Sequence, residues 1–182
     1  RVVNKSRHKI PTGSFVLFLG SNDFHKNAEV VIQALAMPLI KKISIVFVGE
    51  NEELQKTCKC FGISNRTIFF GRLQDEDKAF VMSSASLLVF PSLYEGFGLP
   101  PMEAALMGVP SVCSRRPAMT EVLNDCALFA DPHDCLEWSE QIYKLIHEPY
   151  LRSKIIKKAS ERANKLCWRN SSQKLLKLLS KY

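Results

Sequence analysis

Two carboxylates mark the part of this sequence with the clearest potential for chemistry, residues 92–104 (SLYEGFGLPPMEA). Glu95 and Glu103 are separated by seven residues, which include two glycines and two prolines. Carboxylates accept hydrogen bonds from hydroxyl groups, and glycines let a ligand approach the backbone closely. The free amides at the beginning of a helix bind anions. This combination fits a sugar attached to a diphosphate.

The sequence on either side of the two carboxylates predicts a strand followed by a helix. Residues 85–92 (ASLLVFPS) form a continuous apolar run that ends at Pro91, which is typical of a buried strand. Residues 100–107 begin with two prolines, which helices tolerate in their first turn. We therefore expect Glu95 to leave the carboxyl end of a strand and Glu103 to project from the first turn of the next helix. In an open parallel sheet, ligands bind at that edge.

Short apolar runs alternate with helical patterns along the chain, which predicts βα units around a parallel sheet. The expected strands lie near residues 15–20, 43–48, 67–70, 86–90, 110–113 and 127–130. The expected helices lie near residues 27–37, 51–61, 75–84, 100–107, 118–124 and 134–147, with two more beginning at 149 and 168. The predicted fold class is therefore α/β, a Rossmann-like, doubly wound parallel sheet.

The 92–104 segment resembles the signature of retaining GT-B glycosyltransferases, a large family of bacterial mannosyl-, glucosyl- and rhamnosyltransferases. The resemblance continues in the family's order through FVLFLGSNDFHKN (15–27), ISIVFVGE (43–50), TIFFGRLQDED (67–77), GVPSVCS (108–114), TEVLNDCALFADP (120–132) and CWRNSSQKLLKLL (167–179). It implies the C-terminal, donor-binding half of a GT-B fold, without the N-terminal half that binds the acceptor.

The resemblance also implies a division of the chain into three parts. Residues 1–14 are expected to be a linker or a fragment boundary. Residues 15–148 are expected to form the Rossmann-like, nucleotide-sugar-binding domain. Residues 149–182 are expected to form C-terminal helices that pack on this domain and toward the other half.

The same resemblance assigns roles to individual residues. Glu95 would bind hydroxyls of the donor sugar and Lys26 would pair with the diphosphate, which makes these two the expected catalytic residues. Glu103 would bind the ribose hydroxyls of the nucleotide. The other residues expected to bind the donor are Gly20, Ser21, Arg72, Leu73, Asp75, Phe97, Gly98 and Leu99.

The loop after the first expected strand departs from the family pattern. Many relatives have an arginine directly after the glycine, or an Arg-Lys-Asn triplet, whereas this sequence has Ser21 and His25. One expected cation is thus absent or replaced by a titratable group.

Arg115 and Arg116 are spare cations that we expect near the site. The loop also lacks the second and third glycines of a dinucleotide fingerprint, which argues against NAD.

Two short motifs concern the nucleotide and a metal. Residues 71–73 (GRL) resemble the loop whose backbone contacts the nucleotide base. Residues 75–77 (DED) match the DxD metal motif of a different glycosyltransferase fold. They stand at the expected start of an amphipathic helix, where acids favour the helix dipole, so we expect no metal here. Asp75 accepting hydrogen bonds from guanine would favour a GDP-sugar.

Composition places the chain among globular proteins of one domain, with 182 residues of which 46% are hydrophobic. No apolar run approaches the about 18 residues of a membrane span, and no secretory signal opens the sequence. The six cysteines have no spacing typical of a metal site. We therefore expect them to be free thiols that serve as small core residues, which is typical of proteins in a reducing cytosol.

The net charge of +7 is concentrated near the C-terminus. Residues 150–182 contain ten Lys and Arg against the single acid Glu161, on an amphipathic helical pattern. Three interpretations of this basic helix remain open. Its charged face is simply solvated, or it contacts the cytoplasmic side of an anionic membrane, or it contacts the N-terminal half of the GT-B fold. Nucleic acid is not an expected partner, because no aromatic platform accompanies the charge.

These observations predict the donor-binding domain of a retaining, cytoplasmic glycosyltransferase. The enzyme would transfer a sugar from a GDP- or UDP-sugar to a glycan or lipid-linked acceptor during polysaccharide biosynthesis, with no cofactor and no metal. We expect this chain alone to be inactive, because the acceptor would bind the other half. The alternative is a non-catalytic domain that binds nucleotide-sugars or serves as a scaffold.

Overall fold

The computed structural model describes residues 10–21, 23–49, 52–166 and 168–180 of the chain. A parallel sheet of six strands forms its centre, in the order β3-β2-β1-β4-β5-β6. The strands are β1 (Phe15–Leu19), β2 (Ser44–Val48), β3 (Thr67–Phe70), β4 (Leu87–Phe90), β5 (Ser111–Ser114) and β6 (Leu128–Ala130). Along the chain, β2 and β3 are added on one side of β1, and β4, β5 and β6 are then added on its other side. This is the strand order of a doubly wound fold.

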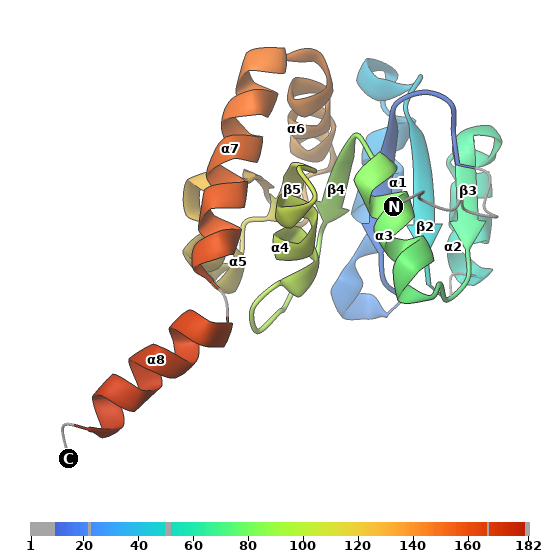
Figure 1. Cartoon of the computed structure of the whole chain (residues 1–182). Helices are drawn as coiled ribbons and strands as arrows, with labels where there is room; N and C mark the ends of the chain where they lie inside the picture. The colour runs from blue at the N-terminus through green and yellow to red at the C-terminus, as the bar shows by residue number, and fades with distance from the viewer. Residues whose placement is uncertain (1–9, 22, 50–51, 167, 181–182) are drawn as a thin grey trace.

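Eight helices are described around this sheet (Figure 1). They are α1 (Ala28–Ala36), α2 (Glu52–Cys60), α3 (Asp75–Ser84), α4 (Leu99–Leu106), α5 (Pro117–Leu123), α6 (Cys135–His147), α7 (Pro149–Lys165) and α8 (Trp168–Leu179). Short 3-10 turns occupy Phe24–Lys26, Pro38–Ile40, Ser64–Arg66 and Asn124–Cys126. The expected fold class is confirmed, and each expected strand and helix is present within two residues of its predicted ends.

Alternating side chains of the strands form the core on both faces of the sheet. Val16 and Phe18 of β1 belong to a buried cluster with residues of α1, α2 and α6. Phe15 and Leu17 belong to a second cluster with residues of α3 and α4. Because both faces are covered by helices, the strands read as continuous apolar runs, which is why the sequence predicted them well.

The cysteines that the structure describes are all free thiols. Cys58, Cys113 and Cys126 are buried, and burial raises the pKa of the Cys113 thiol far above its ordinary value. These three serve as small core residues, as the sequence analysis expected. Cys60 is instead exposed at the end of α2.

The C-terminal helices differ in how they meet this body. Helix α7 packs with Ile155, Ala159 and Ala163 buried, which confirms its expected amphipathic pattern. Its Arg162 donates hydrogen bonds to the carbonyl oxygens of Val122 (2.9 Å) and Glu121 (3.0 Å) at the end of α5. Helix α8 has no buried residue and extends away from the body (Figure 1). Within the described ranges, no helix combines the length and the apolar character needed to cross a lipid bilayer.

Two glycines set the distance between the loops that follow β1 and β2. The amide of Gly20 donates to the carbonyl of Val48 (3.0 Å), which extends the pairing of the strands beyond their ends. Gly49 follows with a φ of 130°, and a Cβ at this position would lie 2.4 Å from the carbonyl oxygen of Gly20. The loop after β1 can therefore lie this close to the loop after β2 only because position 49 carries no side chain.

We expect Gly49→Ala to lower the free energy of unfolding by about 2–4 kcal/mol, because it combines a backbone clash with a left-handed φ. Urea denaturation followed by circular dichroism measures this loss. Gly71→Ala is the matched control, since Gly71 has no neighbouring atom within 4 Å of the added Cβ. Equal stability of the two variants would show that the loops relax apart without cost.

Candidate functional site

The carboxyl ends of β1 and β4 lie side by side, because these strands pair with Phe18 opposite Val89. The loop after β1 carries Lys26 and the loop after β4 carries Glu95. The two side chains form an ion pair, with 2.6 Å between Lys26 Nζ and Glu95 Oε1. Their side chains are only 22% and 19% exposed, so the pair is partly shielded from water. The structure thus brings together the two expected catalytic residues, which are 69 positions apart in the sequence.

Lys26 is held by its surroundings as well as by its acidic partner. It ends the 3-10 turn Phe24–Lys26, and its ammonium lies 5.5 Å from the centre of the Phe90 ring. The backbone of this turn is joined to the loop after β4 by a hydrogen bond from the Leu93 amide to the His25 carbonyl (2.7 Å). The ammonium is therefore placed at the boundary between an aromatic face and the open edge of the sheet, where an anion can reach it.

Asn27 connects three loops of the site, and the sequence analysis assigned no role to it. Its φ of 52° is left-handed, a conformation that asparagine adopts more readily than most residues. Its side-chain amide donates to the carbonyl oxygens of Pro91 (3.2 Å) and Pro132 (2.7 Å). The loops that follow β1, β4 and β6 are thereby fixed to one side chain. The sequence signal that could have revealed this role was an asparagine directly before an expected helix, since asparagine is common at such turns.

The glycine-rich loop ends at Gly98, which has a φ of 82° and precedes α4. The positive φ favours glycine here, and a Cβ at Gly98 would also lie 2.6 Å from Met119 Cε and 2.8 Å from its Sδ, so the end of the Met119 side chain would have to move. The backbone amides of Phe97, Gly98 and Leu99 make no hydrogen bond to any part of the chain that the structure describes. Three unpaired donors in succession suit the oxygens of a diphosphate or a sugar.

The start of α4 corrects one expectation. The helix begins at Leu99, because the left-handed Gly98 ends the preceding loop, and Glu103 therefore lies in the second turn rather than the first. Pro100 and Pro101 occupy the next two positions and have no N–H group. The anion-binding donors are consequently the amides of the loop and of Leu99, and not a full first turn of helix.

Glu103 forms a separate pair with Lys78 of α3, with 3.5 Å between Lys78 Nζ and Glu103 Oε2. The side chains of Lys78 and Glu103 are 35% and 41% exposed, so this pair is weaker and more open than the first. Asp75 begins α3, and Arg72 and Leu73 precede it in the connection from β3. The structure thus links Glu103 to the helix that begins with Asp75.

The expected cations around the first loop are arranged differently from the prediction. Ser21 donates its hydroxyl hydrogen to the carboxylate of Asp23. Arg115 is paired with Glu137, and this hydrogen bond raises the pKa of the arginine. Arg115 is thus paired rather than spare when no ligand is bound, and its expected place near the site stays a prediction. Arg116 Nη2 lies 3.4 Å from the His133 ring nitrogen.

Metal ligands do not gather among the described residues, where no group of three or more His, Cys, Asp and Glu is arranged to hold an ion. Residues 75–77 form the acidic first turn of α3, in the position that the helix dipole favours.

The sheet order, the glycine-rich loop and the paired Lys26 and Glu95 define a candidate site at the carboxyl edge of a doubly wound α/β domain. Residues 3–162 match the family Glycosyl transferases group 1, and the chain belongs to this GT-B family. O-antigen chain mannosyltransferase B of Escherichia coli is 28% identical over 171 residues, which cover 90% of this chain and 45% of the relative.

Solved structures show the same fold at lower identity. Sucrose-phosphate synthase from Thermosynechococcus elongatus superposes with a TM-score of 0.83 at 23% identity, covering 94% of this chain and 46% of that protein. Anabaena Alr3699/HepE, whose structure is a complex with UDP-glucose, superposes with a TM-score of 0.80 at 21% identity, covering 94% and 50%. The chain spans about half the length of these relatives.

The role of Asn27 leads to a prediction for Asn27→Asp. A carboxylate keeps the shape and tolerates the left-handed backbone, but it cannot donate to the two carbonyl oxygens that the amide now satisfies. We expect the free energy of unfolding to fall by about 2–4 kcal/mol. Thermal and urea denaturation measure this change.

Asn124→Asp is the control, because Asn124 has a similar φ of 48° and its side chain has no hydrogen bond to the described residues. A loss of the same size in both variants would mean that the two side-chain hydrogen bonds of Asn27 contribute nothing to stability.

Proposed function

We propose that this chain is the donor-binding half of a retaining glycosyltransferase, which transfers a hexose from a nucleotide-sugar to a glycan or lipid-linked acceptor. The observation that carries the proposal is the ion pair of Lys26 and Glu95, set beside the unpaired amides of residues 97–99 at the carboxyl edge of the sheet. The site offers a cation and backbone donors to a diphosphate, and a carboxylate to sugar hydroxyls.

The relatives support the substrate class. The matched Escherichia coli protein is named as a mannosyltransferase, which supports a hexose. The Anabaena neighbour binds UDP-glucose, which supports a nucleotide-sugar donor. Both UDP- and GDP-sugars remain in the proposal, since Asp75 at the start of α3 would accept hydrogen bonds from a guanine base.

In the proposed reaction, the main contribution of these residues is to stabilise the charge that develops on the leaving diphosphate. Lys26 supplies a full positive charge, and the amides of Phe97, Gly98 and Leu99 supply fixed dipoles that need no rearrangement. Glu95 accepts hydrogen bonds from the sugar and orients the anomeric carbon. These groups perform the task that a divalent cation performs in other transferases, so the proposal requires no metal.

The nucleoside part of the donor would bind a second group of residues, which comprises Glu103 and the loop 71–73. Glu103 accepts from the ribose hydroxyls, and the backbone of residues 71–73 contacts the base. The weak pair with Lys78 leaves the Glu103 carboxylate able to turn toward a ribose at little cost.

Acceptor binding, turnover and location complete the proposal. The acceptor would bind the part of the enzyme that lies beyond this sequence, and this chain alone would transfer no sugar. The enzyme would act in the cytoplasm, where the basic residues of α7 and α8 favour contact with an anionic membrane surface.

A second candidate function is a non-catalytic domain that binds nucleotide-sugars. The observation in its favour is Ser21, whose hydroxyl is engaged by Asp23 where many relatives place an arginine. Sugar transfer by the complete protein, lost in a Lys26→Met variant, would exclude this candidate.

We expect the chain to bind UDP or GDP in the presence of EDTA, because Lys26 and the loop amides provide the counter-charge. Isothermal titration calorimetry with UDP, GDP and ADP, each with and without EDTA, measures this and ranks the bases. Binding that requires added Mg²⁺ or Mn²⁺ would contradict the proposed anion site.

We expect Glu95→Gln and Glu103→Gln to have opposite effects on nucleoside diphosphate. Glu95→Gln removes the carboxylate that competes for Lys26, so the bare diphosphate should bind about 3- to 10-fold more tightly while the nucleotide-sugar binds less tightly. Glu103→Gln should weaken both ligands by about 10-fold, since the ribose loses a charged acceptor.

Calorimetry with a nucleoside diphosphate and its sugar measures both variants. Glu140→Gln, an exposed acid on α6, is the control for net charge. Equal weakening of the bare diphosphate by both substitutions would show that the two carboxylates do not divide the donor between them.

A further inference from the structure

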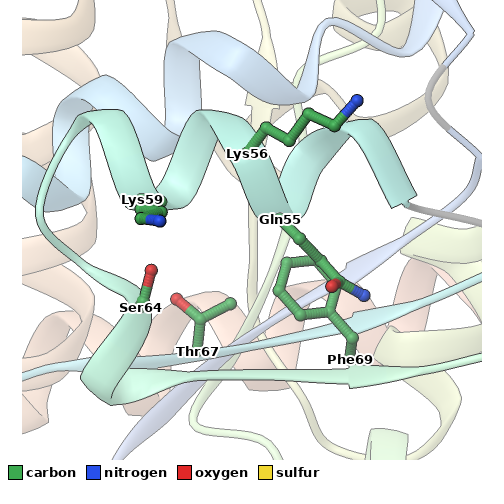
Figure 2. A pocket seen from close by; sticks show the side chains of 6 residues that line it. All are labelled: Gln55, Lys56, Lys59, Ser64, Thr67 and Phe69. Carbon is green, nitrogen blue, oxygen red and sulfur yellow. The ribbon is translucent and has the colours of Figure 1, made fainter.

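A cavity that is largely open to solvent lies between α2 and β3, with a volume of about 380 Å³ (Figure 2). Its walls are formed by Gln55, Lys56, Lys59, Ser64, Thr67 and Phe69. Thr67 opens β3 and Phe69 is its third residue, so the cavity lies beside the first part of this strand. In the candidate donor site, Lys26 and Glu95 lie instead at the carboxyl ends of β1 and β4, and residues 71–73 follow the carboxyl end of β3. The two sites are therefore distinct.

The cavity carries positive charge that the described residues do not neutralise. Lys56 and Lys59 are one turn apart on α2, and neither forms an ion pair with a described acid. In Figure 2, Lys59 lies over the space above Ser64 and Thr67, whereas the ammonium of Lys56 points away from them. Arg66 adds nothing to this wall, because it is turned inward and donates to the Ile43 carbonyl (2.6 Å). Lys59 is thus the main cation of the cavity.

The hydroxyl groups below Lys59 have complementary roles. Thr67 Oγ1 already donates to the carbonyl of Ile63 (2.8 Å), so its remaining lone pairs can accept from a ligand hydroxyl. The Ser64 hydroxyl has no partner in the described part of the chain and can donate to an anion. The amide of Gln55 lies on the other side of the cavity, beside the Phe69 ring.

An aromatic ring closes one side of the cavity. Phe69 stacks on Phe47 of β2, with ring centres 5.0 Å apart and 9° between the ring planes. In the described sheet β3 is the edge strand, so the ring has a strand neighbour on one side and faces the cavity with the other. A flat ring of a ligand can pack on this face. The volume lies within the range of about 300–1,000 Å³ that is usual for small-molecule sites.

We propose that this cavity is an accessory binding site for a phosphomonoester of a sugar or nucleoside. The phosphate, with a charge of about −1.5 to −2 at neutral pH, is held by Lys59 and by the Ser64 hydroxyl. The sugar or base packs on Phe69, and a ligand hydroxyl donates to Thr67. The assignment does not depend on the proposed transferase activity, because it rests on side chains outside the donor site.

The test is a titration of the ¹⁵N-labelled chain at low ionic strength, followed by amide chemical shifts, with ribose, inorganic phosphate, ribose 5-phosphate and AMP. We expect ribose 5-phosphate to shift the amides of residues 59–69 and to bind more tightly than phosphate or ribose alone. Tighter binding of AMP than of ribose 5-phosphate would identify a nucleoside as the ligand source, and equal binding would identify a sugar. Excess UDP should not displace either ligand.

Two variants and one control locate the binding energy. Lys59→Gln should weaken ribose 5-phosphate by about 5-fold, and Ser64→Ala by about 2-fold. Lys154→Gln, an exposed lysine on α7, should leave the affinity unchanged and controls for net charge. Three results would overturn the proposal. The first is equal affinity for inorganic phosphate and ribose 5-phosphate, and the second is amide chemical-shift changes confined to residues 97–99. The third is an equal loss of affinity for ribose 5-phosphate in Lys59→Gln and Lys154→Gln.

Discussion

A partly buried ammonium must be paired, and this constraint organises the candidate donor site. Lys26 lies against Phe90 with little access to water, so its charge requires an acidic neighbour when no ligand is bound. Glu95 meets that requirement from a loop far away in the sequence. A diphosphate can take the place of Glu95 as the counter-charge, which releases the carboxylate toward the sugar on the same ligand. In the proposed function, binding of the donor would thus be an exchange of partners, and the two charged groups already lie close together.

The exchange is useful only if the loops stay in place while the partners change. Three backbone positions provide this rigidity. Asn27 ties the first loop to the loops after β4 and β6, Gly49 admits the close approach of Gly20, and Gly98 turns the chain against Met119. Each uses a left-handed or extended-positive φ that most residues avoid. The strain is tolerated because neighbouring strands of a parallel sheet end at one edge, where each loop is supported by the next.

The fold could be predicted from the sequence because its signals are local. Strands covered on both faces appear as apolar runs, and Gly or Pro marks their ends. The resemblance located Lys26 and Glu95, and the parallel sheet explains why they meet. The sequence could not show that Arg115 is matched by Glu137, because that pair depends on the side chains of β5 and α6 lying together. It also expected α4 to begin one residue too late, so Glu103 lies in the second turn rather than the first; the helix begins at Leu99, directly after the left-handed Gly98.

The two ion pairs divide the donor site into a rigid part and an adjustable part. The pair of Lys26 and Glu95 is short and about four-fifths buried, so salt screens it little and its geometry is well defined. The pair of Lys78 and Glu103 is longer and more than a third exposed, and such pairs contribute at most about 1 kcal/mol. In the proposed function, the diphosphate and sugar would therefore meet groups that are already positioned, whereas the nucleoside would meet a carboxylate that must leave a weak partner. This asymmetry follows from burial alone, and it places the demand for accurate geometry where the bond between sugar and phosphate would break.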